Sequence, residues 1–251
     1  MCGRFTLATP PEQIRRYFGY AEQPNFPPRY NIAPTQPVAV VRSASGARQF
    51  ALVRWGLLPP WVKDVKGFPL LINARSEEAA GKPAFRNAMR RRRCLVPADG
   101  FYEWQAPAAS GGRKAPFAVR RPDGGPFAFA GLWELYSDAD GNEIETAAIL
   151  TGAANRTLAP IHHRSPVVIE PADFDRWLDV SSDSVEPVAD LLRPPPDDFF
   201  TAFAVSTRVN AVANDDPGLI LPVEGEAIPP QARPAEPARR PDPGDDQLKL
   251  L

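Results

Sequence analysis

Residues 117–151 read FAVRRPDGGPFAFAGLWELYSDADGNEIETAAILT. Three runs in this stretch are rich in aromatic and other apolar residues and predict strands: 117–121, 127–136 and 144–151. Residues 123–125 (DGG) and 140–141 (DG) predict hairpin turns between them, because glycine readily adopts the positive φ angles of such turns. Strands joined by tight turns pair antiparallel, so this stretch predicts a largely antiparallel sheet.

The segments on either side extend this pattern. Further runs with strand composition lie at 38–41, 50–55, 70–73, 94–96, 101–104 and 202–206. Helices are predicted at 10–20, 76–93, 171–179 and 185–192. Residues 24–37 hold too many prolines for a helix and are expected to form a loop or an extended segment. The predicted fold class is α+β, with a largely antiparallel, barrel-like β core flanked by short helices.

Length and composition indicate one sizeable domain. The chain has 251 residues and a net charge of −1, so DNA binding would require a local basic patch. We expect a folded domain over 1–223 and a Pro-rich, disordered tail over 224–251, since the tail has almost no aromatic residues. No segment has the length or apolar character of a membrane helix or a signal peptide. The expected location is the cytoplasm, in association with DNA.

Cys2 is the residue with the most distinctive chemistry. Removal of Met1, which is usual before a small residue, would leave an N-terminal 1,2-aminothiol. Its amine and thiol have reference pKa values of about 7.7–8.0 and about 8.5. The amine can attack an aldehyde to give an imine, and the thiol can then close a thiazolidine ring. The alternative is an incidental cysteine at a frayed terminus.

A series of short motifs gives this cysteine its context. They are MCGRF (1–5), YNIAP (30–34), WGL with PW (55–57 and 60–61), NARSE (73–77), RCLVPADGFYEW (93–104), IHHRSP (161–166) and VS with VN (205–206 and 209–210). In order and spacing, from residue 1 to about 223, the series closely resembles the SRAP family of SOS-response-associated peptidases or abasic-site-processing proteins. Each motif alone is weak evidence, whereas the whole series is specific.

The resemblance implies roles for individual positions. Cys2 matches the crosslinking nucleophile, Asn73 the residue that positions the Cys2 amine and the sugar, and Glu103 the acid/base residue. His162 matches the active-site histidine of a His-x-Arg-Met-Pro motif, in which Ser165 replaces the usual Met. Contacts with DNA phosphates are implied for Arg4, Asn31, Arg75 and Arg164. Trp55 and Trp61 correspond to positions near the loop that wedges against bases.

The residue types agree with these roles, although each has a structural alternative. Glu and His are suited to the proton transfers of sugar-ring opening and imine formation. A lone glutamate in an aromatic strand more often faces water, however, and a lone histidine is more often structural. Trp55 and Trp61 suit base stacking, but at least one of them is expected in the core. The run 90–93 (RRRR) fits a phosphate track or a solvated helix end equally well.

The resemblance therefore implies a DNA-damage enzyme with lyase-like chemistry. It would bond covalently to abasic sites in single-stranded DNA, its partner, and shield the lesion; Met1 removal would be autoproteolytic. Two alternatives remain: an N-terminal-nucleophile cysteine peptidase and a non-catalytic single-stranded-DNA-binding module. We expect a monomer that uses no cofactor, because no Gly-rich phosphate loop is present. No metal site is expected, since residues 138–141 (DADG) and the two histidines lack further ligands at suitable spacing.

Overall fold

The computed structural model describes residues 2–107 and 112–223. Met1 and the segment from residue 224, where the tail is expected, lie outside the described residues. The strands are β1 (Phe5–Leu7), β2 (Arg29–Ile32), β3 (Pro37–Ala44), β4 (Ala47–Trp55), β5 (Asn73–Arg75), β6 (Arg93–Ala98), β7 (Gly100–Gln105), β8 (Ala115–Arg120), β9 (Phe127–Ser137), β10 (Glu143–Ala153), β11 (Arg164–Pro166), β12 (Val168–Ile169) and β13 (Thr201–Ala204). The α-helices are α1 (Pro11–Phe18), α2 (Ser76–Ala79), α3 (Arg86–Arg91) and α4 (Phe174–Leu178), and the 3-10 helices are η1 (Pro171–Asp173), η2 (Glu186–Leu191), η3 (Thr207–Asn210) and η4 (Pro217–Ile220).

The strands form two sheets. The smaller has the order β13-β8-β7-β1-β2, and the larger has the order β11-β10-β4-β3-β6-β9-β12. Because β9 also pairs with β10, the strands β10, β4, β3, β6 and β9 close into a ring. Most pairs are antiparallel, and β10 runs parallel to β4 and β5. The predicted α+β class with a barrel-like core and short helices is confirmed.

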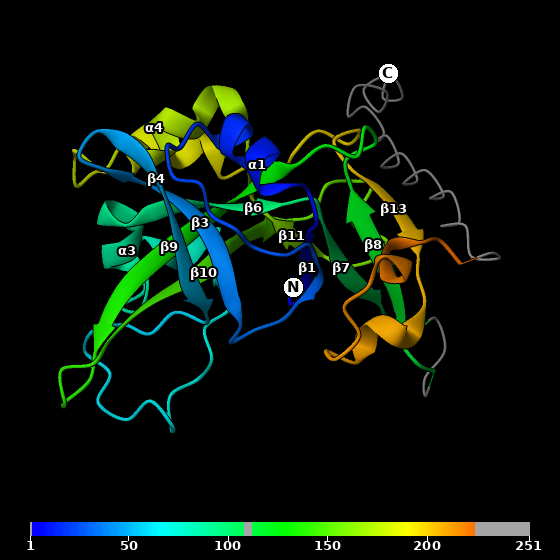
Figure 1. Cartoon of the computed structure of the whole chain (residues 1–251), viewed down its shortest axis with the longest axis horizontal. Coiled ribbons are helices and arrows are strands. Elements are labelled where there is room, and N and C mark those ends of the chain that lie inside the picture. The colour runs from blue at the N-terminus through cyan, green and yellow to red at the C-terminus, as the bar shows by residue number, and fades with distance from the viewer. Residues whose placement is uncertain (1, 108–111, 224–251) are drawn as a thin grey trace, which may run out of the picture.

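The two sheets lie side by side, with β1 at their junction (Figure 1). Helices α1 and α4 cover one end of the closed ring in this view. Helix α1 begins with Pro11 in its first turn and ends at Gly19, whose φ of 71° is left-handed. Its buried face carries Ile14 and Phe18. These features agree with the helix predicted over 10–20.

Some local predictions differ from the structure. The basic helix expected over 76–93 is two short helices, α2 and α3, because Gly81 and Pro83 interrupt it. The turn at 123–125 does not close a hairpin, since β8 pairs with β7 and β13 whereas β9 pairs with β6, β10 and β12. It carries the chain from one sheet into the other. Strands β1, β11 and β12 have no counterpart in the sequence prediction. By contrast, β9 and β10 form the expected hairpin.

Aromatic side chains tie the ring to β1. Phe5 makes edge-to-face contacts with Trp55 and Phe129, at centroid distances of 5.2 Å and 5.9 Å. All three side chains are almost fully buried. Such pairs contribute about 0.5–1.5 kcal/mol beyond their burial. The beginning of the chain is thereby fixed against the barrel, which positions Cys2.

Among the described residues, no helix combines the length and apolar character needed to cross a membrane.

Candidate active site

Cys2 lies where the extension of β1 runs beside β7. The register places Phe5 opposite Phe101, and the amide of Tyr102 donates to the carbonyl of Arg4 at 3.0 Å. Continued along the chain, this antiparallel register would place Gly3 opposite Glu103 and Cys2 opposite Trp104, so Cys2 lies one position beyond the level of Glu103. Cys2 is fully buried, and its Sγ is 3.8 Å from the Arg4 carbonyl oxygen.

Asn73 reaches the same point from the larger sheet. It begins β5, which runs parallel to β10 with Asn73 opposite Ile149. Its Nδ2 donates to the Cys2 carbonyl at 2.8 Å. Its Oδ1 is buried and has no hydrogen-bond partner within residues 2–107 and 112–223. One side of the amide thus fixes the Cys2 backbone, and the other presents an acceptor.

Glu103 and His162 complete the group around Cys2. Glu103 is buried on β7 and 5% exposed. Burial, and then the negative charge of Glu103, raise the pKa of the Cys2 thiol. Burial lowers the pKa of His162, and the Glu103 charge offsets part of that shift. The thiol and the imidazole are therefore both neutral near pH 7, with a carboxyl group acting on each.

In an extended segment the side chains of His162 and His163 would point to opposite faces, but the structure places them otherwise. Their rings stack at a centroid distance of 4.4 Å, rather than pointing to opposite faces, because the pair precedes β11 and is not part of it. His162 is half-buried and His163 is exposed. The Nδ1 of His162 is 3.0 Å from both the amide nitrogen and the carbonyl oxygen of Arg164, which orients the ring.

Two of the arginines expected to bind phosphate are paired with carboxylates. Arg164 makes a two-point ion pair with Glu77, at 2.5 Å and 2.9 Å, and also donates to the Thr151 carbonyl at 2.5 Å. Its side chain is 10% exposed. Arg75 donates to Glu78 at 3.1 Å, and its side chain is 55% exposed. A DNA phosphate would therefore have to share these guanidinium groups with the carboxylates, or displace the carboxylates from them.

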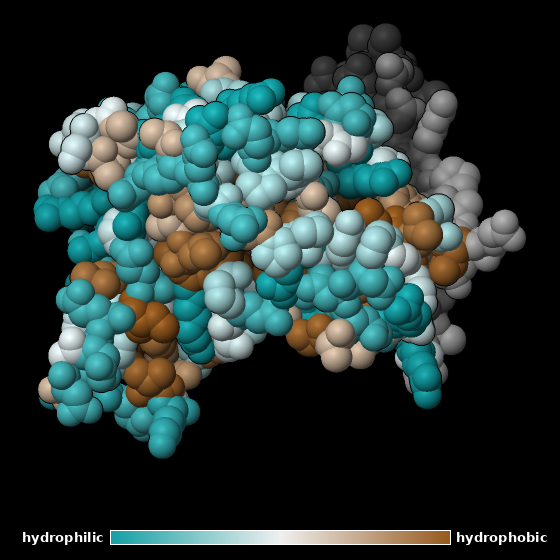
Figure 2. All heavy atoms as spheres, in the orientation of Figure 1, coloured by the Kyte–Doolittle hydropathy of each residue, from teal (hydrophilic) through white to brown (hydrophobic). Residues whose placement is uncertain are grey.

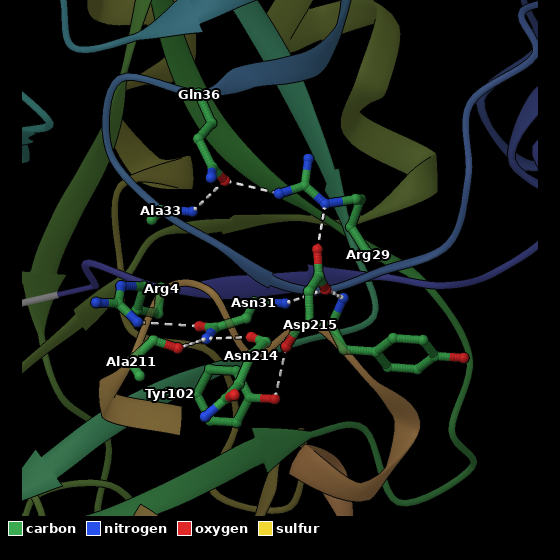
Figure 3. Close-up of polar contacts among 10 residues, drawn as sticks. Arg4, Arg29, Asn31, Ala33, Gln36, Tyr102, Ala211, Asn214 and Asp215 are labelled. Carbon is green, nitrogen blue, oxygen red and sulfur yellow. Dashed lines mark hydrogen bonds and ion pairs between the residues drawn. The ribbon is translucent and has the colours of Figure 1, made fainter. Parts of the chain in front are cut away.

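Arg4 differs in that its hydrogen bonds in the described chain go to neutral acceptors. Its NH1 group donates to Asn31 Oδ1 at 3.0 Å and to the Val209 carbonyl at 2.9 Å. Its NH2 group is 3.4 Å from the Asn210 carbonyl oxygen. Asn31 itself is fully buried, and its amide is used by protein partners (Figure 3). No carboxylate in the described chain pairs with Arg4, so its positive charge is uncompensated. The buried Asn31 side chain accepts one of its hydrogen bonds.

The two tryptophans of the turn after β4 are in different environments. Trp55 is 1% exposed and donates from Nε1 to the Ile72 carbonyl at 2.9 Å, so it is the core residue that the sequence left open. Trp61 is 55% exposed and contacts Phe68 edge to face at 5.7 Å. Figure 2 shows apolar patches over the segment that follows β4, in the lower left of the view. Val65 and Leu70 are further exposed apolar side chains of this segment.

Comparison with known proteins decides the family. The family described as SOS response associated peptidase (SRAP) matches residues 1–212. The chain belongs to the SRAP family.

Curated relatives and solved structures of similar proteins cover most of this SRAP chain. It is 35% identical to the abasic site processing protein YoqW of Bacillus subtilis, over 88% of this chain and 99% of the relative. It is 33% identical to the abasic site processing protein YedK of Escherichia coli, over 89% of this chain and 100% of the relative. A crystal structure of a protein from Bacteroides thetaiotaomicron superposes with a TM-score of 0.79 at 23% identity, over 88% of this chain and 100% of that one. A protein from Bordetella bronchiseptica gives 0.70 at 29% identity, over 82% and 100%.

The SRAP site also contains residues that sequence reasoning did not single out. Trp104 donates from Nε1 to Asn210 Oδ1 at 2.8 Å, beside Arg4. Glu77, which holds Arg164, lies 87 positions from it, and no sequence signal indicates that pairing. Trp104 could have been identified from the sequence, because it follows Glu103 in a strand and its side chain must point to the face opposite to that of Glu103.

The arginine run 90–93 of the SRAP chain is mostly structural. Arg91 pairs with Asp183 and Arg92 with the buried Glu134. Arg93 is buried and donates to backbone carbonyls, including that of Trp177 at 2.7 Å. A continuous phosphate track is therefore not available here. Among the described residues, no group of three or more His, Cys, Asp or Glu side chains is arranged to hold a metal ion.

Proposed function

We propose that this protein captures abasic sites in single-stranded DNA as a thiazolidine formed by Cys2. After loss of Met1, the Cys2 amine adds to the aldehyde of the ring-opened sugar. Loss of one water gives an imine. The thiol then adds to the imine carbon, and its proton passes to the nitrogen, so that the complete reaction releases one water. The covalent product shields the lesion, and the protein acts as a monomer.

The observation that carries the proposal is the convergence of three other elements on Cys2, which lies in the extension of β1. Asn73 holds the Cys2 carbonyl at 2.8 Å, and the charge of Glu103 acts on both Cys2 and His162. These residues come from β1's extension, β5, β7 and the segment before β11, which are far apart in sequence. A structural cysteine needs no such acid/base surroundings. The relatives YoqW and YedK, named as abasic site processing proteins, support the same substrate.

The protonation states fit proton transfer at neutral pH. Opening the sugar hemiacetal and expelling water require a group that gives up and takes back a proton. His162 has a lowered pKa and is neutral, so it can accept a proton from the sugar hydroxyl. Glu103 lies in the same buried region and can exchange protons with the amine as the imine forms. We assign lyase-like acid/base roles to these two residues.

Single-stranded DNA fits the surroundings of the site. Arg4 offers an uncompensated cation near Cys2, and the exposed Trp61 offers a ring for stacking on a base. Arg75 is exposed and can reach a second phosphate by exchanging its bond to Glu78. These side chains would contact the phosphates and the faces of the bases, but not the hydrogen-bonding edges of the bases. We therefore expect weak sequence preference and binding that falls with salt.

A general cysteine peptidase is less consistent with this site. Such enzymes use a thiolate beside a protonated histidine, which requires a lowered thiol pKa. Here the pKa of Cys2 is raised and that of His162 is lowered. We therefore limit peptidase activity to a single autoproteolytic removal of Met1, and expect no cleavage of peptides in trans.

The test mixes the mature protein with an oligonucleotide that carries one abasic site, followed by a denaturing gel. We expect a slower band for the wild type and none for Cys2→Ala, with both proteins binding the DNA under native conditions. Cys94→Ala is the matched control, since that thiol is also buried but belongs to β6 and is not at the N-terminus. Equal binding without any denaturant-stable band for the wild type would support a non-catalytic binding module instead.

A further inference from the structure

Strand β2 is an edge strand, and a carboxylate covers its exposed amides. It ends the five-stranded sheet in the order β13-β8-β7-β1-β2. Unpaired amides of an edge strand need another acceptor. Asp215 supplies one: its Oδ1 accepts from the amides of Tyr30 and Asn31 at 2.5 Å and 3.0 Å. Its Oδ2 accepts from Arg29 Nε at 2.5 Å.

Asn31 fastens the same segment from the other side. Its Nδ2 lies within hydrogen-bond distance of the carbonyls of Val209 at 3.2 Å, Ala211 at 3.1 Å and Asn214 at 2.8 Å. Asn31 is fully buried, so these bonds are shielded from water. Figure 3 shows its amide between Arg4 on one side and the carbonyls of Ala211 and Asn214 on the other. Residues 206–216, here called the strap, are thus held on β2 by the side chain of Asn31 and the carboxylate of Asp215.

The strap in turn holds the guanidinium of Arg4. Two of its carbonyls, those of Val209 and Asn210, accept from NH1 and NH2, and Asn31 Oδ1 accepts a second NH1 hydrogen. Both NH1 hydrogens and one NH2 hydrogen are used by the protein, so among the described residues the Nε hydrogen and the second NH2 hydrogen form the edge left for a ligand. That edge is the fork that binds a phosphate through two parallel hydrogen bonds. Its direction depends on where the strap lies.

We propose that Asp215 is a positioning residue for phosphate binding: by fixing the strap on β2, it aims the free edge of the Arg4 guanidinium at the DNA backbone. The proposal rests on the proposed function, from which the phosphate ligand is taken. Asp215 itself touches no DNA. A negative charge close to a DNA-binding arginine would ordinarily weaken binding, but here Arg29 neutralises it, at 2.5 Å. Gln36 holds Arg29 in place by accepting from its NH2 group at 2.7 Å.

Loss of the Asp215 carboxylate also frees the Arg29 cation, which by itself would strengthen DNA binding, so a loss of affinity in Asp215→Asn points to the direction of the Arg4 guanidinium. In Asp215→Asn the side chain has one acceptor for three donors, so the strap loosens and the fork loses its direction. One phosphate contact contributes about 0.7 to the slope of log K against log salt for a single strand. Loss of one charge-assisted contact corresponds to about tenfold or more in affinity.

The experiment measures binding to a single-stranded oligonucleotide with a tetrahydrofuran abasic analogue, which cannot react with Cys2. Fluorescence anisotropy over a salt series gives the slope for wild type, Asp215→Asn, Arg4→Ala and the double variant. We expect both single variants to lose about 0.7 of the slope and about tenfold in affinity, and the double variant to match Arg4→Ala. Asp183→Asn, which breaks an exposed pair with Arg91, is the matched control and should bind as wild type.

A purely structural role for Asp215 would give a different pattern. The melting temperature would then fall while the slope of log K against log salt stayed at the wild-type value, or the effects of Asp215→Asn and Arg4→Ala on affinity would add. Either result overturns the proposal. If Asp215→Asn fails to fold, Asp215→Glu keeps the charge but displaces the carboxylate by one methylene. The same non-additivity with Arg4→Ala is then expected, at a smaller size.

The outcomes also separate this proposal from the proposed function. If wild type forms no covalent adduct with an abasic oligonucleotide and does not bind the analogue, both are overturned. If wild type crosslinks and Arg4→Ala weakens binding, but the loss of affinity from Asp215→Asn adds to that from Arg4→Ala in the double variant, only the positioning role is overturned.

Discussion

Asn73 Nδ2 donates a hydrogen bond of 2.8 Å to the carbonyl of Cys2, across 71 positions of sequence. The bond joins the start of the smaller sheet to β5, which pairs with β10 of the closed ring. It therefore ties the Cys2 backbone to the closed ring. The buried Oδ1 of the same amide lacks a partner among the described residues, which leaves an acceptor for the Cys2 amine or a sugar hydroxyl.

His162 and His163 should differ sharply in their effects on adduct formation. We expect His162→Ala to slow formation or reversal by about 10²–10⁴, the typical effect of losing one acid/base group. His163→Ala removes an exposed ring that stacks on His162 at 4.4 Å, and should remain close to wild type. Time courses of adduct formation, and of transfer to a competitor oligonucleotide, provide the measurement. Slow adduct formation in His163→Ala, together with a wild-type rate in His162→Ala, would show that the acid/base role is assigned to the wrong ring.

Trp61 and Trp55 form a second matched pair. Trp61 is 55% exposed, so Trp61→Ala should weaken single-stranded DNA binding by about 1–3 kcal/mol and leave thermal unfolding unchanged. Trp55 is 1% exposed and packs on Phe5, so Trp55→Ala should destabilise the fold by about 3–5 kcal/mol. Anisotropy and thermal melts distinguish the two. Unaltered DNA affinity in Trp61→Ala would exclude it from the binding surface.

How far the sequence could predict the fold depended on the range of the interactions. The β9–β10 hairpin was predictable because its turn residues and strand composition are local. Pro83 is a local signal too, because a proline interrupts a helix, and it predicts two helices in place of one over 76–93. The passage of the chain between sheets at 123–125 was not predictable, since pairing with distant strands decides it. The burial of Trp55 likewise depends on Phe5, 50 positions earlier in the chain.

The candidate site was found through its motifs, and the support around it was not. Cys2, Asn73, Glu103 and His162 stand in motifs that resemble the family, and the structure brings them together. The pairing of Arg164 with Glu77 and the docking of Asp215 on β2 depend on three-dimensional proximity alone. No local pattern encodes such contacts, so the orientation of each arginine could only come from the structure.

Acid should remove the stabilisation that Glu77 provides. The Arg164 guanidinium lowers the pKa of Glu77 from 4.5 to about 2. A lowered folded-state pKa contributes stability above the unfolded value of 4.5, and that contribution is lost as the pH falls toward about 2. Thermal melts of wild type and Glu77→Gln should therefore differ modestly above pH 4.5 and converge below it, because the Glu77 side chain is half exposed. A difference that grows toward acid pH would contradict this assignment.

Ser165 should be replaceable at a gain in stability. It is 1% exposed, and its Oγ is buried without a hydrogen-bond partner in the described chain. An unsatisfied buried hydroxyl costs about 1–3 kcal/mol. We expect Ser165→Ala to raise the melting temperature by about 2–4 °C, as for a gain of about 1 kcal/mol in a protein of this size. Ser206→Ala is the control with the opposite sign, because Ser206 accepts from the amide of Arg208 at 3.3 Å. A lower melting temperature for Ser165→Ala would reveal a bond to its hydroxyl.

Ring closure by Cys2 can be tested by the mass of the adduct formed with a single-stranded abasic oligonucleotide, with and without borohydride. A thiazolidine resists reduction, whereas an imine gains two hydrogens and is trapped. For the wild type we predict the mass of the protein without Met1 plus the oligonucleotide minus one water, identical under both conditions. Cys2→Ser, which keeps the amine, should give a stable adduct only with borohydride, and a protein that retains Met1 should give none without borohydride. A wild-type adduct that requires borohydride, or an equal adduct from the Met1-blocked protein, would contradict ring closure by Cys2.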